Sequence, residues 1–239
     1  MIPTAINGRW RLRLPAHRAE RAEWDIANGG WEVARIASMA EHLGPGDILY
    51  DCGAEEGDMT ALFGSFGAEV VAIEANPMVW PCLKATWEAN VDRPLAGWYV
   101  GFVGADIAER PPHLDVNAQP VDGWPECAYG EMIPAHGFRH LYQQADATPT
   151  ITLDALVERI GIPPTALTLD CEGSELAIMR GAGDVLAKHR PLVWISVHDE
   201  FMGYYGHSPA DLHRHMAGFG YRSSHLATDH EAHWLYEPT

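Results

Sequence analysis

Positive charge is scarce in this chain. Its 239 residues include 16 Lys and Arg against 33 Asp and Glu, which gives a formal net charge of −17 with neutral histidines. So acidic a surface repels nucleic-acid phosphates and anionic lipids at physiological salt. The composition therefore argues against nucleic acid and against a membrane as partners, and it favours small-molecule or protein substrates.

Long apolar runs and paired cysteines are missing as well. No stretch approaches the roughly 18 uninterrupted apolar residues of a membrane span, and the opening Met-Ile-Pro-Thr-Ala-Ile-Asn contains no apolar signal core. The four cysteines occur singly, so their spacing indicates neither a zinc site nor a disulfide framework. We therefore expect a cytoplasmic protein with reduced thiols. The composition is also compatible with an oligomer.

The few basic residues are concentrated near the N-terminus. Four of the 33 acids lie in the first 35 positions, together with six of the 16 basic residues, namely Arg9, Arg11, Arg13, Arg18, Arg21 and Arg35. One interpretation is an Arg-rich arm folded onto an acidic body, and the alternative is a contact surface for an anionic partner.

Length and composition indicate a globular protein with one enlarged domain. The chain falls between one and two domains at the usual roughly 150 residues per domain, and its 47% hydrophobic content is ordinary for a buried core. We expect a helical N-terminal arm over residues 1–44 and a single domain over residues 45–239.

Apolar segments alternate with amphipathic ones from residue 48 onward. The expected strands are 48–52, 69–74, 98–103, 166–171 and 192–197, and the expected helices are 59–66, 78–90, 153–160, 175–189 and 209–217. Pro77 suits a first-turn position in the second helix, and residues 221–226 and 233–236 predict a closing hairpin. This alternation is typical of parallel βαβ units.

Residues 106–150 interrupt the alternation and predict an insertion or a lid. The segment is rich in Pro, Gly and single aromatics. It is a natural source of acceptor selectivity, although its side chains are equally suited to packing; those of interest are Trp124, Tyr129, Phe138, Arg139, His140 and Tyr142.

A glycine loop and an acid follow the first two predicted strands. Gly53 and Gly57 allow a sharp turn and close approach of a ligand. The loop lacks the third glycine of the dinucleotide pattern G-x-G-x-x-G and contains Asp51, Glu55 and Glu56, which suit a cation better than a diphosphate. S-adenosylmethionine carries a sulfonium and an amino group and no phosphate. Glu74 at the second strand end is placed to accept hydrogen bonds from ribose hydroxyls.

Three segments resemble one known family. They are Asp51-Cys52-Gly53-Ala54-Glu55-Glu56-Gly57-Asp58-Met59-Thr60, then Ile73-Glu74-Ala75-Asn76-Pro77, and then Thr152-Leu153-Asp154-Ala155-Leu156 with Asp170-Cys171-Glu172-Gly173-Ser174-Glu175 and Gly181-Ala182. Over roughly residues 45–222 the chain is similar to the FkbM-type methyltransferases. Glu55 stands where the family usually has Asn, and Ser196 where many members have Glu.

The resemblance implies a Rossmann-like class I methyltransferase fold. Such a fold has a seven-stranded, mostly parallel sheet with helices on both faces, here with the insertion after the third strand. The resemblance also implies S-adenosylmethionine as cofactor and, in many members, O-methylation of sugars and natural products. The expected cofactor-binding residues are Asp51, Cys52, Gly53, Ala54, Glu55, Gly57, Asp58, Thr60, Glu74, Ala75, Asn76, Val103 and Asp170.

Polar side chains at two later strand ends are the candidates for catalysis. Asp170 and Glu172 follow one strand, and His198 and Asp199 follow the next, so the four are expected to converge over the methyl group. His198 is the preferred general base because its unperturbed pKa lies nearest neutrality, and it matches a frequent family histidine. Mg²⁺ held by the same four residues is an alternative, and acids that merely open a helix are another.

Two other functions remain open from the sequence. A nicotinamide-dependent oxidoreductase shares the acid after the second strand, and a catalytically silent member would bind cofactor or a partner only. The preferred hypothesis is O-methylation of a hydroxyl on a sugar, glycan or other small molecule.

Overall fold

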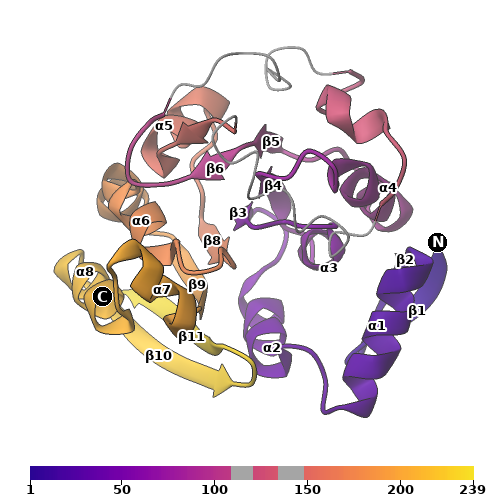
Figure 1. Ribbon diagram of the computed structural model, residues 1–239, viewed down its shortest axis with the longest axis horizontal. Helices are drawn as coiled ribbons and strands as arrows, with labels where there is room; N and C mark the ends of the chain where they lie inside the picture. Colours follow the sequence, from indigo (N-terminus) through magenta and orange to yellow (C-terminus); the bar gives the residue numbers. More distant parts are fainter. Residues whose placement is uncertain (109–120, 134–147) are drawn as a thin grey trace.

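A central seven-stranded sheet organises the chain. The computed structural model describes residues 1–108, 121–133 and 148–239 (Figure 1). Across the sheet the strands run in the order β10-β11-β9-β8-β3-β4-β5. Their bounds are β3 Ile48–Cys52, β4 Glu69–Glu74, β5 Gly97–Val100, β8 Ala166–Leu169, β9 Leu192–Val197, β10 Tyr221–Thr228 and β11 Ala232–Pro238.

The sheet is parallel except at one edge. β5, β4, β3, β8 and β9 pair in parallel, whereas β11 pairs antiparallel with both β9 and β10. Strand order reverses between β3 and β8, which is where open α/β sheets bind ligands. The predicted class I fold and its seven-stranded, mostly parallel sheet are confirmed.

Helices cover both faces of the sheet (Figure 1). Side chains of α5, α6 and α8 share one core cluster with alternate residues of the strands, such as Val71 and Ile73 of β4. The intervening residues, Val70 and Ala72, enter the opposite cluster with α2, α3 and α4. Because both faces are buried, the sequences of these strands are continuous runs of apolar residues. The helix bounds are α2 Val33–His42, α3 Asp58–Ser65, α4 Trp80–Asn90, α5 Leu153–Ile160, α6 Glu175–Arg180 and α8 Pro209–Gly218.

Four predicted elements are shorter than expected, and one of them is the strand predicted over 166–171, which ends at Leu169. The third strand breaks at Gly101 into β5 and β6 Phe102–Val103, and β6 pairs with β7 Thr150–Ile151 in a separate sheet. α4 begins at Trp80, so Pro77 lies outside the helix and not in its first turn as predicted. The Asn76 Oδ1 accepts the Met78 backbone N–H and forms a turn there instead.

The helix predicted over residues 175–189 is also interrupted. It ends at Gly181, where a Cβ would lie 2.1 Å from the Gly104 carbonyl oxygen, so the chain passes too close to another backbone to continue regularly. A π-helical turn over Val185–His189 follows. The remaining short elements are η1 Glu126–Tyr129, α7 Asp199–Met202 and η5 Gly203–Tyr205.

The N-terminal arm is not wholly helical, contrary to the prediction. It begins with an antiparallel hairpin, β1 Ile2–Ile6 and β2 Trp10–Leu14, followed by α1 Ala16–Ala27 and α2. In β2 the apolar residues Leu12 and Leu14 are buried and alternate with exposed arginines, a period of two that identifies a strand. The hairpin and α1 pack against α3 through a cluster of Ile6, Leu12, Leu14, Ala19, Ala22, Ile36, Ala61 and Leu62.

Within residues 1–108, 121–133 and 148–239, we find no helix long and apolar enough to span a bilayer.

Gly53 provides a test of the sheet geometry. It has a φ of +90°, and a Cβ there would lie 2.1 Å from the Asp170 carbonyl oxygen on the neighbouring strand. The close approach that requires glycine is therefore to β8. Gly53→Ala is expected to lower the free energy of unfolding by more than about 1–3 kcal/mol, the usual strain of such a residue. Gly218→Ala, with nothing within 4 Å, is the control for urea denaturation; equal midpoints for the two variants would contradict this account.

Candidate active site

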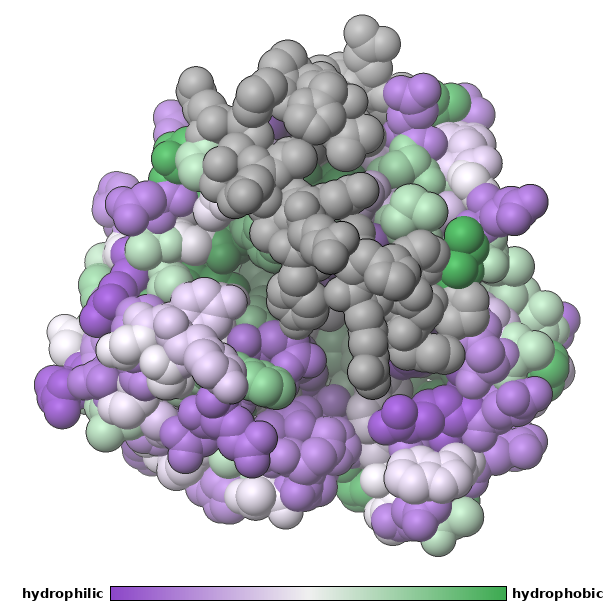
Figure 2. Space-filling view, in the orientation of Figure 1, coloured by the Kyte–Doolittle hydropathy of each residue, from purple (hydrophilic) through white to green (hydrophobic). Residues whose placement is uncertain are grey.

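A cavity of about 680 Å³ opens at the carboxyl ends of the central strands. The sheet side is lined by the ends of β3, β4, β8 and β9, the opposite side by the N-terminal arm, and one rim by the turn between β10 and β11. The lower half of the face shown in Figure 2 is dominated by hydrophilic residues. The location agrees with the rule for ligand sites in open α/β sheets.

Most of the expected cofactor residues line this cavity. Those that do are Asp51, Gly53, Ala54, Glu55, Asp58, Glu74 and Asp170. Two of the others contact residues of the lining: Thr60 donates to Asp51 Oδ2 at 2.6 Å, and the Asn76 backbone N–H donates to Glu74 Oε1 at 2.6 Å. The residues outside the lining are Cys52, Gly57, Thr60, Ala75, Asn76 and Val103, and Val103 lies in the core on β6.

The glycine loop fixes the direction of the Glu74 carboxylate. Glu74 Oε2 accepts the Glu55 backbone N–H at 2.9 Å, and Oε1 accepts that of Asn76. Burial raises the pKa of Glu74, and these backbone hydrogen bonds oppose the rise. Glu55 has a φ of +46°, a left-handed conformation that Asn adopts more readily than Glu. Its carboxylate turns toward the arm, where it lies 3.3 Å from Arg18 Nη1.

Arg18 joins the arm to the same loop. Its Nε donates to Asp58 Oδ2 at 2.6 Å, so a guanidinium and a carboxylate lie at the N-terminus of α3. The interpretation of an Arg-rich arm folded onto acidic residues is therefore correct for Arg18 and for Arg35.

Arg35 lies in the floor of the site and was not predicted from sequence. It extends from α2, is 2% exposed, and donates to Thr168 Oγ1 at 2.5 Å, Ser196 Oγ at 2.8 Å and Asp170 Oδ2 at 3.1 Å. It also donates to Glu32. Burial lowers the pKa of Arg35, but the charges of Glu32 and Asp170 outweigh burial and raise it above its usual range. The guanidinium is therefore a permanent buried cation.

Asp51 also lies beside Arg35. Its side chain is buried at the end of β3, and burial raises the pKa of Asp51 to about 6, against the hydrogen bond from Thr60 and the charge of Arg35. Ser196, at the position where the family often has Glu, contributes a hydroxyl that contacts both Arg35 and His233 Nδ1.

His198 is held among three carboxylates. Its Nδ1 lies 2.7 Å from Glu175 Oε1, and its Nε2 lies 3.4 Å from Asp170 Oδ1 and 3.9 Å from Glu172 Oε2. Burial lowers the pKa of His198, but the hydrogen bond to Glu175 and the nearby carboxylates outweigh it and raise the pKa to about 9. The imidazole therefore carries a proton at neutral pH in the free protein. The unperturbed pKa near neutrality, for which His198 was preferred as a base, does not apply in this environment.

The predicted catalytic group is only partly assembled. Asp170, Glu172 and His198 line the cavity, whereas Asp199 is exposed at the start of α7 and is not part of the lining. Glu175, which also opens α6, is fully buried and accepts from the Gly173 backbone N–H as well as from His198. Its carboxylate therefore orients the imidazole in addition to any effect on the helix dipole.

Glu231 takes the place that Asp199 was expected to fill. It comes from the turn between β10 and β11, and its carboxylate lies within 4.8 Å of the donor atoms of Asp170 and His198. Burial and the charge of Asp170 raise the pKa of Glu231 to about 7, although His230 lowers it. Sequence spacing contained no signal for this approach, because it depends on Ala232 pairing with Val197 across the antiparallel edge.

The four residues predicted to hold Mg²⁺ do not all meet. Asp170, Glu172 and His198 line the cavity and Asp199 does not, whereas the donor atoms of Asp170 and His198 lie within 4.8 Å of that of Glu231.

The described part of the insertion contains two of the six residues expected to select the acceptor. Trp124 is buried in the core beside α4, and Tyr129 is half exposed with Lys84 Nζ 5.4 Å from its ring centroid. Phe138, Arg139, His140 and Tyr142 lie outside the described residues.

Comparison with known proteins identifies one family. The family profile described as Methyltransferase FkbM domain matches residues 51–223, more than half of the chain. No curated protein matches.

Solved structures are similar at low sequence identity. A methyltransferase FkbM from Methylobacillus flagellatus is 17% identical with a TM-score of 0.46, over 80% of this chain and 43% of that one, so the present chain spans less than half of its length. A TehB-like SAM-dependent methyltransferase from Corynebacterium glutamicum is 10% identical with a TM-score of 0.46, over 93% and 97% of the two chains. A precorrin-6y C5,15-methyltransferase from Geobacter metallireducens is 10% identical with a TM-score of 0.46, over 85% and 87%.

Arg35→Met tests whether the buried guanidinium maintains the site. Removing one partner of a buried ion pair leaves uncompensated charges, here on Glu32 and Asp170, and a loss of about 3–5 kcal/mol in the free energy of unfolding is expected. Arg222→Met removes a 68% exposed guanidinium paired with Glu237, and its denaturation midpoint should change far less. Similar midpoints for the two variants in urea denaturation would show that Arg35 has no such role.

Proposed function

The chain belongs to the FkbM methyltransferase domain family, and we propose that it transfers the methyl group of S-adenosylmethionine to a hydroxyl of a sugar, glycan or other small molecule. The observation that carries the proposal is the cavity wall in which the Glu74 carboxylate, held by two backbone amides, adjoins the acidic glycine loop. A cofactor whose ribose hydroxyls donate hydrogen bonds and which also carries positive charge is complementary to such a wall.

The residues present fit this cofactor. Each Glu74 oxygen accepts one backbone N–H and keeps a further lone pair for a ribose hydroxyl. Asp51, Glu55 and Asp58 bring negative charge to the same cavity, which suits a sulfonium and an ammonium group.

A dinucleotide fits the site less well. Pyrophosphate binds at an open helix N-terminus through free backbone amides. At the N-terminus of α3 the Asp58 carboxylate and Arg18 are already paired with each other. This contact, together with the missing third glycine, disfavours the nicotinamide-dependent oxidoreductase.

The cofactor supplies a methyl group on a sulfonium leaving group, and the protein has to align the acceptor and remove its proton. Asp170 and His198 stand at the ends of β8 and β9, and Gly53 of the glycine loop approaches the Asp170 backbone directly. The groups that act on the acceptor therefore adjoin the loop that holds the cofactor.

His198 is the proposed general base once a cation is bound. Glu175 holds Nδ1, so Nε2 is the nitrogen on the side of Asp170 and Glu172. A positive charge in the cavity disfavours the imidazolium and lowers the pKa of His198 from about 9. His198 then gives up its proton to solvent, and its Nε2 accepts the proton of the acceptor hydroxyl.

An aromatic row beside His198 supports a sugar-like acceptor. Phe201 lines the cavity and stacks on His198, with ring centroids 6.1 Å apart and an interplanar angle of 24°. Tyr204, which is 85% exposed, stacks in turn on Phe201. Flat aromatic faces with one polar tip suit the apolar face and hydroxyls of a sugar.

Cofactor binding is tested by thermal shift. S-adenosylmethionine and S-adenosylhomocysteine should raise the melting temperature, whereas NAD should not. Glu74→Gln should weaken cofactor binding by about tenfold or more, since hydrogen bonds to a charged group contribute about 1.5–3 kcal/mol. Glu69→Gln, at the exposed opposite end of β4, should bind normally. Stabilisation by NAD alone would refute the proposal.

The base is tested by the pH dependence of turnover, with an acceptor found by screening sugars, glycans and metabolites with labelled methyl donor. The base acts only when deprotonated, so kcat/KM should rise with pH and level off above about 9, the pKa of His198 in the free enzyme. The corresponding rise in kcat should occur at lower pH, because bound cofactor lowers this pKa. His198→Gln should retain cofactor binding and lose about 10²–10⁴-fold in kcat; unchanged turnover would remove His198 from the mechanism.

A further inference from the structure

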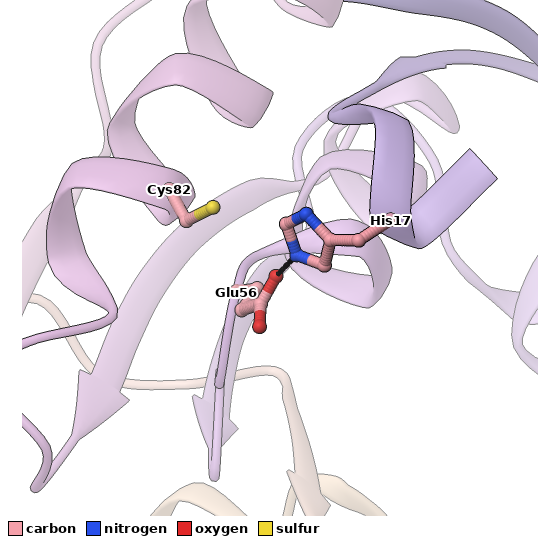
Figure 3. Close-up of side chains that lie close together, drawn as sticks. All are labelled: His17, Glu56 and Cys82. Atoms are coloured by element: carbon pink, nitrogen blue, oxygen red, sulfur yellow. Dashed lines mark hydrogen bonds and ion pairs between the residues drawn. The ribbon is translucent and has the colours of Figure 1, made fainter. Parts of the chain in front are cut away.

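Three side chains that are distant in sequence meet behind the glycine loop. His17 belongs to α1, Glu56 to the loop between β3 and α3, and Cys82 to α4. Their donor atoms all lie within 4.8 Å of one another. Figure 3 shows the hydrogen bond between the His17 ring and Glu56, with the Cys82 sulfur turned toward the ring. Glu56 and Cys82 are fully buried, and the cluster is separate from the residues that line the cavity.

We propose that His17, Glu56 and Cys82 form a binding site for a divalent transition metal ion of the zinc class. Thiolate, imidazole and carboxylate are the three ligand types that zinc sites use, and a thiolate together with an imidazole selects against Mg²⁺ and Ca²⁺. Tetrahedral ligand atoms bonded to zinc at about 2.0–2.3 Å lie about 3.3–3.8 Å from one another. The donor atoms of His17 and Glu56, now joined by a hydrogen bond, therefore have to move apart to admit the ion between them.

The local charge favours a cation at this position. Glu55, Glu56 and Asp58 surround the Arg18 guanidinium, so three carboxylates face one positive group. A divalent ion bound by Glu56 and a Cys82 thiolate offsets both ligand charges, and burial of the site then requires no net charge.

The solvent reaches the cluster from the side of His17. The His17 side chain is 26% exposed, whereas Glu56 and Cys82 are buried. With three protein ligands, the fourth position of a tetrahedral zinc ion would be filled by water.

Metal binding exchanges a proton at the thiol. Burial and the neighbouring Glu56 raise the pKa of Cys82 to about 12, so the thiol is protonated in the metal-free protein. When the sulfur–metal bond forms, the S–H bond breaks and the proton passes to solvent.

Metal binding would hold the N-terminal arm against the rest of the domain. One ion would link α1, the loop between β3 and α3, and α4. The site does not rest on the proposed methyl transfer, because none of its three ligands lines the cavity.

Metal titration of the whole chain tests the site. Chelator-treated protein is titrated with Zn²⁺ by calorimetry and with Co²⁺ by absorption spectroscopy. We expect one equivalent of Zn²⁺, release of about one proton per ion in buffers of different protonation enthalpy, and a thiolate-to-cobalt charge-transfer band. The other two clusters of donor atoms in the described residues contain no cysteine, so the band distinguishes them from this one.

Variants locate the bound ion. Cys82→Ser should abolish the charge-transfer band, and His17→Gln, at a partly exposed position, should weaken Zn²⁺ binding by more than about tenfold. Cys127→Ser and His42→Gln are the matched controls and should bind as the parent does. Absence of the band in the parent protein, or a band and affinity that survive both Cys82→Ser and His17→Gln, would overturn the proposal. The parent's Co²⁺ spectrum and His17→Gln decide the matter even if Cys82→Ser does not fold.

Discussion

A single buried guanidinium makes the acidic site possible. Asp51, Asp170 and Glu32 lie around Arg35 in the lining of the cavity, and like charges in a buried place would force some of them to bind protons. Arg35 extends from α2 into their midst and also donates to hydroxyls on β8 and β9. This one side chain thereby joins the arm to the carboxyl ends of the strands and offsets the negative charge of the cavity.

Sequence reasoning succeeded where information is local. The bounds of β4 and β9 match the predicted strands because each is a continuous apolar run bounded by polar residues. The loop after β3 and the acid ending β4 were found for the same reason. The closing hairpin of β10 and β11 was predicted from its two short strands, whereas its place beside β9 was not, since periodicity does not order the strands of a sheet. The β1–β2 hairpin was missed although Leu12 and Leu14 alternate with arginines.

The parts of the site that escaped prediction depend on tertiary pairing. Arg35 lies on a helix whose sequence gives no sign of a buried charge, and Glu231 reaches Asp170 only because β11 returns antiparallel beside β9. The protonation of His198 follows from Glu175, Asp170 and Glu172 together, at distances that no spacing in the sequence determines. Residue type indicated which side chains could act in acid–base chemistry. Their protonation states depend on the packing around them.

The arm that closes the cavity lies ahead of the segment that defines the family. Residues Ile6 to Arg35 contribute one wall, whereas the matched segment starts at residue 51 with the strand end opposite. The family profile and the cavity therefore coincide only in part. A fragment that began at residue 51 would keep the strand ends of the site and lose the wall that faces them.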